Sequence, residues 1–73
     1  MKKNVHVVPR GGDWAVRREG AQRDSSHHET QSAAIDAARQ TARRESTELF
    51  VHGRNGQIRE RDSFGNDPYP PKG

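Results

Sequence analysis

Histidine is the residue type of this chain best suited to chemistry, and it occurs at His6, His27, His28 and His52. An imidazole can bind a metal ion or carry a proton at neutral pH. A zinc site, however, needs three or four converging ligands, and the chain has no cysteine to supply any of them. His27 and His28 are adjacent, so in an extended segment their side chains point apart. We therefore predict no metal site and no cofactor, and expect surface histidines that titrate at about pH 6.5.

Catalysis is not expected either. The serines are scattered through polar stretches, without a nucleophile elbow, and no glycine-rich phosphate loop is present. Glu60 and Asp62 alternate beside Ile58, but the end of a short strand is a poor place for an acid–base pair. With 73 residues, of which 27% are hydrophobic, the chain has little material for a water-excluding pocket. The sequence predicts a protein that is not an enzyme.

Two glycine-containing turns organise the elements that position these side chains. Gly11-Gly12 separates residues 4–10 from 13–19, and Asn55-Gly56 separates residues 48–54 from 57–62. Both are typical two-residue hairpin connections, because Gly and Asn tolerate positive φ. Counting outward from the first turn pairs Val7 with Val16, and the register decides which side chains share a face.

The same counting separates an apolar face from a face rich in cations. It predicts that one face of the sheet carries an aromatic residue among histidines and arginines: His6, Arg17, Phe50, His52, Arg59 and Arg61. A presented sheet face of this kind can contact a protein partner, or it can stack bases and bind phosphates.

A helix is predicted between the hairpins. Thr30 is a typical N-cap, and residues 31–45 contain five alanines with neither Gly nor Pro. Ile35, Ala38 and Ala42 recur at helical spacing, with Ala34 beside them, and form a narrow apolar stripe. The end of the helix is poorly signalled, because no glycine follows Glu45.

These elements predict an α+β fold of the order β-β-α-β-β, in which one helix packs on one face of a small sheet. A short additional edge strand is expected near residues 25–28. We expect an antiparallel sheet, since one solvated face is ordinary there. We predict a single domain over residues 1–62. The core is expected to contain these side chains: Val5, Val7, Trp14, Val16, Ile35, Ala38, Ala42, Leu49, Val51 and Ile58.

Residues 63–73 are expected to form a tail rich in Gly, Asn and Pro. Its Pro68-Tyr69-Pro70-Pro71 run contains a spacing that recognition domains can bind as a polyproline helix. Alternatively, Phe64 and Tyr69 could anchor the tail as a strap across the sheet.

Composition adds limits of its own. The formal charge of +3 and the pI near 10.0 come mostly from arginine. Arginine suits phosphate or carboxylate partners, although a solvated basic surface is the simpler explanation of the charge. No apolar run reaches the length of a membrane span, so we expect a cytoplasmic protein with no membrane contact. A core this thin favours a marginal monomer or a homodimer.

Nearly the whole chain resembles a small bacterial family known as domain of unknown function 2188. The likeness is carried by Asn4-Val5-His6-Val7-Val8-Pro9, Trp14-Ala15-Val16, Thr30-Gln31, Ala34-Ile35, Ala37-Ala38-Arg39, His52-Gly53-Arg54-Asn55-Gly56, Ile58-Arg59 and Gly65-Asn66-Asp67-Pro68. Members commonly have an acidic residue three places after the threonine. Ala33 stands there in this chain, so the capping box is incomplete. The resemblance implies no activity, cofactor or catalytic residue.

The sequence therefore predicts a small, non-enzymatic interaction module that binds a protein partner or a second copy of itself. A nucleic-acid-binding accessory protein, using the basic and aromatic face, is the alternative.

Overall fold

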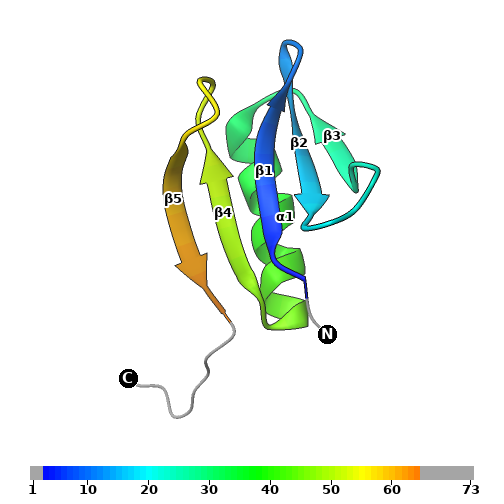
Figure 1. Cartoon of the computed structure of the whole chain (residues 1–73), viewed down its shortest axis with the longest axis vertical. Helices are drawn as coiled ribbons and strands as arrows, with labels where there is room; N and C mark the ends of the chain where they lie inside the picture. The colour runs from blue at the N-terminus through cyan, green and yellow to red at the C-terminus, as the bar shows by residue number, and fades with distance from the viewer. Residues whose placement is uncertain (1–2, 65–73) are drawn as a thin grey trace.

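A five-stranded sheet with one helix on one of its faces makes up the structure, a computed structural model that describes residues 3–64 (Figure 1). Along the chain the elements are β1 (Val5–Arg10), β2 (Asp13–Arg18), β3 (Ser26–His28), α1 (Gln31–Glu45), β4 (Glu48–His52) and β5 (Ile58–Ser63). The strands lie in the order β3-β2-β1-β4-β5. The predicted α+β class is confirmed, including the short edge strand, which is β3.

The first hairpin has the predicted register. Val7 pairs with Val16, and Arg10 pairs with Asp13 across the two-residue turn. Gly11 has a φ of +62°, whereas Gly12 does not have a positive φ. A positive φ at the first central residue alone is typical of a type II′ turn, whose twist matches that of the strands it joins.

Helix α1 has the predicted limits at both ends. The Thr30 hydroxyl accepts a hydrogen bond from the Ala33 backbone N–H at 3.1 Å, as an N-cap does. At the other end, the N–H of Thr47 donates to the carbonyl of Ala42 at 2.9 Å. Ser46 lies between them in the left-handed region, with φ 57° and ψ 51°. This arrangement is a Schellman motif in which serine occupies the position that usually needs glycine.

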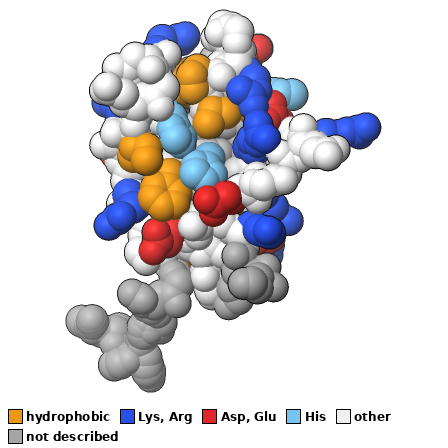
Figure 2. Space-filling view, in the orientation of Figure 1, with side chains coloured by type: hydrophobic (Ala, Val, Ile, Leu, Met, Phe, Trp, Pro, Cys, Tyr) orange, Lys and Arg blue, Asp and Glu red, His pale blue; other side chains and the backbone are white. Residues whose placement is uncertain are grey.

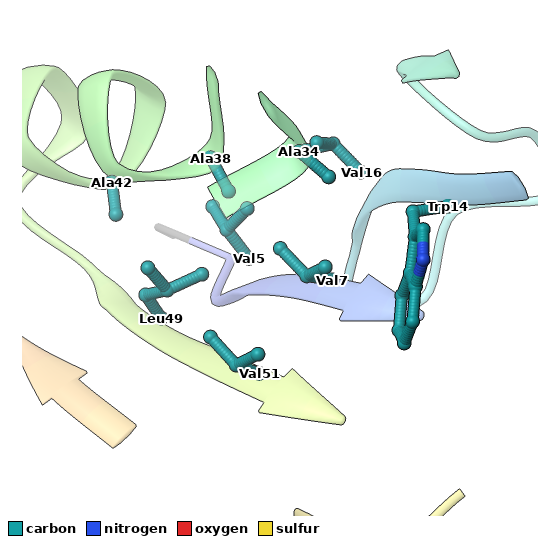
Figure 3. Packing of buried hydrophobic residues seen from close by; sticks show 9 residues of the cluster. All are labelled: Val5, Val7, Trp14, Val16, Ala34, Ala38, Ala42, Leu49 and Val51. Carbon is teal, nitrogen blue, oxygen red and sulfur yellow. The ribbon is translucent and has the colours of Figure 1, made fainter. Parts of the chain in front are cut away.

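The core lies between α1 and the sheet (Figure 3). Three alanines of α1, Ala34, Ala38 and Ala42, are fully buried and point at the strands. Because their side chains are small, the helix packs close to the sheet. The strand residues of this covered face are Val5, Val7, Trp14, Val16, Leu49 and Val51. Ile35 is only partly buried, and packs at the margin of this cluster.

The prediction of an antiparallel sheet is wrong at its centre, because β1 and β4 are parallel neighbours. β3 is antiparallel to β2 and therefore runs in the direction of β1. Helix α1 then carries the chain back along the sheet, so that β4 enters in that same direction (Figure 1). A helical crossover of this kind joins parallel strands. The sheet is mixed.

The second hairpin also differs from its predicted register near the turn. Gly53 N–H donates to the Gln57 carbonyl at 2.7 Å, so the loop has three residues, the last of which, Gly56, has a φ of +86°. Val51 pairs with Glu60 as predicted, but His52 pairs with Ile58, which leaves Arg59 as the extra residue of a β-bulge. The bulge turns Ile58 away from the core, and 56% of its surface is exposed.

Strand β5 and the residue after it continue slightly beyond the predicted domain limit at residue 62. Strand β5 runs through Ser63, and the Phe64 N–H donates to the Thr47 carbonyl at 3.1 Å. The Phe64 side chain packs against the core beside Arg43. Tyr69 and the proline run lie outside the described residues.

Candidate functional site

The face of the sheet opposite α1 is the candidate site, and we call it the open face. Figure 2 looks onto it and shows histidines at the centre, hydrophobic side chains next to them and Lys or Arg side chains toward the rim. By strand pairing and alternation its central residues are His6, Val8, Arg17, Phe50, His52, Ile58 and Arg61. The buried Ala15 and the charged or polar residues Arg10, Asp13, His27 and Glu48 lie on the same face.

One row of side chains crosses four strands of the open face. Arg17 of β2 pairs with His6 of β1, and His6 pairs with Phe50 of β4 across the parallel ladder. Phe50 in turn pairs with Arg61 of β5. An aromatic residue therefore lies between a histidine and an arginine, and the row ends in a cation on each side.

The two histidines of the open face contact each other directly. The Nδ1 atom of His6 lies 3.0 Å from the Nε2 atom of His52, and both side chains are half-buried. The His6 ring also stacks on Phe50, with ring centroids 5.1 Å apart and planes inclined by 22°. The ring of His6 is thus held by two contacts from β4.

Hydrogen bonding assigns the tautomers of this pair. The His52 Nδ1 atom lies 3.2 Å from the carbonyl oxygen of Gly56, which can only accept a hydrogen bond, so Nδ1 carries a proton. In a neutral imidazole the Nε2 atom of His52 is then an acceptor. His6 must donate to it from Nδ1. The chain of donors runs from His6 to His52 to the turn of the β4–β5 hairpin.

Burial, the neighbouring His52 and the Arg17 guanidinium together lower the pKa of His6 below its ordinary value of 6.5, although Glu19 opposes them. His6 is therefore neutral at pH 7, in agreement with the assigned tautomer. A neutral imidazole with a free lone pair is both a base and a metal ligand.

The structure brings five of the six predicted residues together on the open face. The exception is Arg59, the bulge residue, whose guanidinium donates to the side chain of Gln31 at the start of α1, at 3.2 Å. Arg17 donates to the Ala21 carbonyl at 2.5 Å, so the following loop holds it in place.

The other two histidines lie apart from this pair. His27 contacts the Asp24 carboxylate at 3.0 Å, and His28 contacts the Ser26 hydroxyl at 2.8 Å. Arg10 also binds Asp24, and this hydrogen bond holds the pKa of the carboxyl below its usual value. Within residues 3–64, no group of three or more His, Asp or Glu side chains is placed to hold a metal ion.

Sequence reasoning missed two features of the open face. The contact between His6 and His52 depends on β1 and β4 being neighbours, which the hairpin patterns do not reveal. Ile58 joins this face because of the bulge, for which the only signal was a glycine at the third position of the loop.

Comparison with known proteins identifies the family. Residues 5–64 match a family described as an uncharacterized protein conserved in bacteria, DUF2188. The uncharacterized protein YdaT of Bacillus subtilis (strain 168) is 35% identical over 66 residues, which are 90% of this chain and 44% of that protein. The chain thus spans less than half the length of this relative. No solved structure matches.

In the part of the chain that the structure describes, no helix is long and apolar enough to cross a membrane. The family model covers most of the chain, and the predicted resemblance is confirmed: the chain belongs to the DUF2188 family.

Proposed function

We propose that this chain is a non-enzymatic interaction module that binds a protein partner through its open face. The observation that supports the proposal is the apolar surface left outside the core. Ile58 is 56% exposed, and Val8 and Phe50 are half-buried although α1 lies on the other side of the sheet. Arg17 and Arg61 flank this surface. Protein interfaces are enriched in aromatic residues and arginine, and this surface presents both.

The β5 edge of the sheet is a less suitable site for self-association than the open face. Strand β5 is an edge strand, and its residues Arg59 to Asp62 alternate between positive and negative charge. In a two-fold antiparallel pairing, residues of equal parity oppose each other, so arginine would face arginine and carboxylate would face carboxylate. Like charges directly opposite destabilise a ladder. A homodimer, the first partner to test, would therefore form through the open face.

Site-specific photocrosslinking in bacterial cells tests the proposal. A photoreactive residue in place of Ile58 should give a discrete covalent adduct, whose mass identifies a second copy or another protein. The matched control carries the same residue in place of Gln40, an exposed position of α1 on the opposite side of the sheet. No adduct at position 58, or the same adducts from both positions, would contradict the proposal.

Nucleic-acid binding is the second candidate, and the row from Arg17 to Arg61 favours it, because an aromatic ring between cations can contact bases and phosphates. Two observations weigh against it. His6 covers one side of the Phe50 ring. Many guanidinium groups also have partners within the chain, namely those of Arg10, Arg18, Arg39, Arg43, Arg54 and Arg59.

Fluorescence polarisation with mixed-sequence DNA and RNA at low salt separates the two candidates. Nucleic-acid binding predicts an affinity that falls steeply with salt and weakens when Arg17 and Arg61 are both replaced by alanine. Absence of binding at about 100 µM, the weak end of non-specific affinities, rejects this candidate.

A cytoplasmic location is part of the proposal, and the cysteine-free composition is compatible with it. Cell fractionation with an antibody against the chain tests it directly.

A further inference from the structure

We propose that the open face binds an acidic segment of its protein partner. One large apolar side chain of that segment enters a hollow beside Phe50 and Ile58, and a neighbouring carboxylate binds Arg61. This assignment rests on the proposed protein interaction, and it adds the part of the open face that is used and the chemistry of the partner.

The β2–β3 side of the open face is already covered by side chains of the chain itself. Ala15 lies on this face and is fully buried. His27, its neighbour across the ladder, and Arg10 both bind the Asp24 carboxylate, at 3.0 Å and 2.9 Å. A partner therefore finds accessible apolar surface on the other side of this face, over β4 and β5.

A hollow of about 310 Å³ lies on that side. It is lined by Phe50, Ile58, Arg59, Glu60 and Arg61. The bulge at Arg59 turns Ile58 onto this face, and bulges often re-aim a side chain next to a functional site. Ile58 is also the exposed large hydrophobic residue of the described chain. The hollow thus suits one anchoring side chain of a partner, as the central pockets of protein interfaces do.

The charge around the hollow favours an acidic partner. Two arginines and one glutamate line it, which leaves one positive charge in excess. Arg59 already donates to the side-chain oxygen of Gln31 at 3.2 Å. Arg61 forms no ion pair with a carboxylate of residues 3–64, whereas three other arginines do. An exposed guanidinium of this kind can bind a carboxylate through two parallel N–H groups.

A peptide suits the hollow better than a nucleic acid does. A single strand is bound by a groove with several cations and by aromatic rings on which bases stack. His6 already stacks on one face of the Phe50 ring, and the Arg17 guanidinium is held by the Ala21 carbonyl. What remains matches one apolar anchor and one carboxylate.

Titration of the ¹⁵N-labelled full chain with short synthetic peptides, followed by ¹H–¹⁵N NMR, tests the site. The probe is acetyl-Glu-Glu-Phe-Glu-Glu-amide at millimolar concentration. It should shift the backbone amide signals of Phe50, Ile58 and Arg61, and leave that of Gln40 on α1 in place. Replacing its phenylalanine with serine removes the anchor, and replacing its glutamates with lysine reverses the charge. Either control peptide should bind at least about fivefold more weakly.

Variants of the chain separate the anchor from the charge. Ile58 and Arg61 are both exposed, so Ile58→Ser and Arg61→Ala should leave the fold intact. Each should weaken binding of the glutamate peptide at least about twofold. Arg61→Glu should make the lysine peptide bind more tightly than the glutamate peptide. The matched control, Arg44→Ala, removes the same charge from an exposed position of α1 and should leave the affinity unchanged.

Several results overturn the proposal. They are the absence of shifts at Phe50, Ile58 and Arg61 in the unaltered chain, equal binding of the glutamate and lysine peptides, and an equal loss of affinity in Arg44→Ala. A short oligothymidylate that shifts the same amides at a lower concentration than the peptide also overturns it. Crosslinking from position 58 distinguishes the two proposals. An adduct without peptide binding rejects only this partner chemistry, whereas the absence of an adduct rejects the protein interaction itself.

Discussion

The two faces of the sheet are built from alternate residues of the same strands, yet they differ in almost every physical respect. The buried cluster of the covered face contains only valine, leucine and tryptophan side chains against alanines, and Thr47 is the single buried polar residue among those described. The open face mixes imidazole, guanidinium and aromatic groups that keep contact with solvent. In β4, Leu49 and Val51 lie on the covered face, whereas Phe50 and His52 lie on the open face. The comparison teaches that one face of the short ladder supplies the core, and that the binding we propose uses the opposite face.

The largest effect is expected from substitutions of the neighbouring residues Leu49 and Phe50, which test whether only the covered face stabilises the fold. Leu49 is fully buried, so Leu49→Ala should lower the free energy of unfolding by about 2–5 kcal/mol. Phe50→Ala should cost less, since its ring stays half-buried on the open face. Denaturant unfolding of the two variants measures both values. Equal losses would mean that the open face is also a core.

Overpacking the covered face is the second test. Ala38 is fully buried between α1 and the sheet, so Ala38→Leu should destabilise the protein by about 1–3 kcal/mol. Ala33, on the exposed side of the same helix, is the matched control. Ala33→Leu should leave the midpoint of denaturation nearly unchanged. A tolerated leucine at position 38 would show that helix and sheet do not need to lie close together.

A substitution at the C-terminal end of α1 should increase the stability of the protein without changing either face of the sheet. Ser46 has a positive φ of 57°, a conformation that is strained for any residue with a Cβ atom. Ser46→Gly should therefore raise the free energy of unfolding by about 1 kcal/mol, with the open face unchanged. Thermal unfolding measures the change. A lower melting temperature would indicate that the serine side chain itself stabilises the turn.

The smallest expected effect is a pH dependence that His6 of the open face supplies. The pKa of His6 is lower in the folded chain than in the unfolded one, where it is near 6.5. The stability that this provides is complete above pH 6.5 and is lost as the pH falls through the lower folded value. His6→Gln should flatten the profile of stability against pH below about pH 6.5. An unaltered profile would assign the dependence to other groups.

Local signals in the sequence were sufficient to predict the helix and the strands of both hairpins. They were insufficient to predict which strands lie next to each other in the sheet. Gly11 and the alternation of Val5 and Val7 define the first hairpin, and Thr30 defines the start of α1, because each acts over a few residues. The pairing of His6 with Phe50 joins residues 44 positions apart, and no local pattern encodes it. The bulge at Arg59 likewise arises from the three-residue loop rather than from strand alternation.

The parallel pairing of β1 and β4 has a consequence for how the chain folds. Both hairpins and α1 form from contacts close in the sequence, whereas β1 and β4 can meet only after α1 has crossed the sheet. Closing so long a loop is entropically unfavourable, and contacts of this kind slow folding. We expect this docking step to limit the folding rate, and the contact between His6 and His52 to be absent until the two halves of the chain have joined.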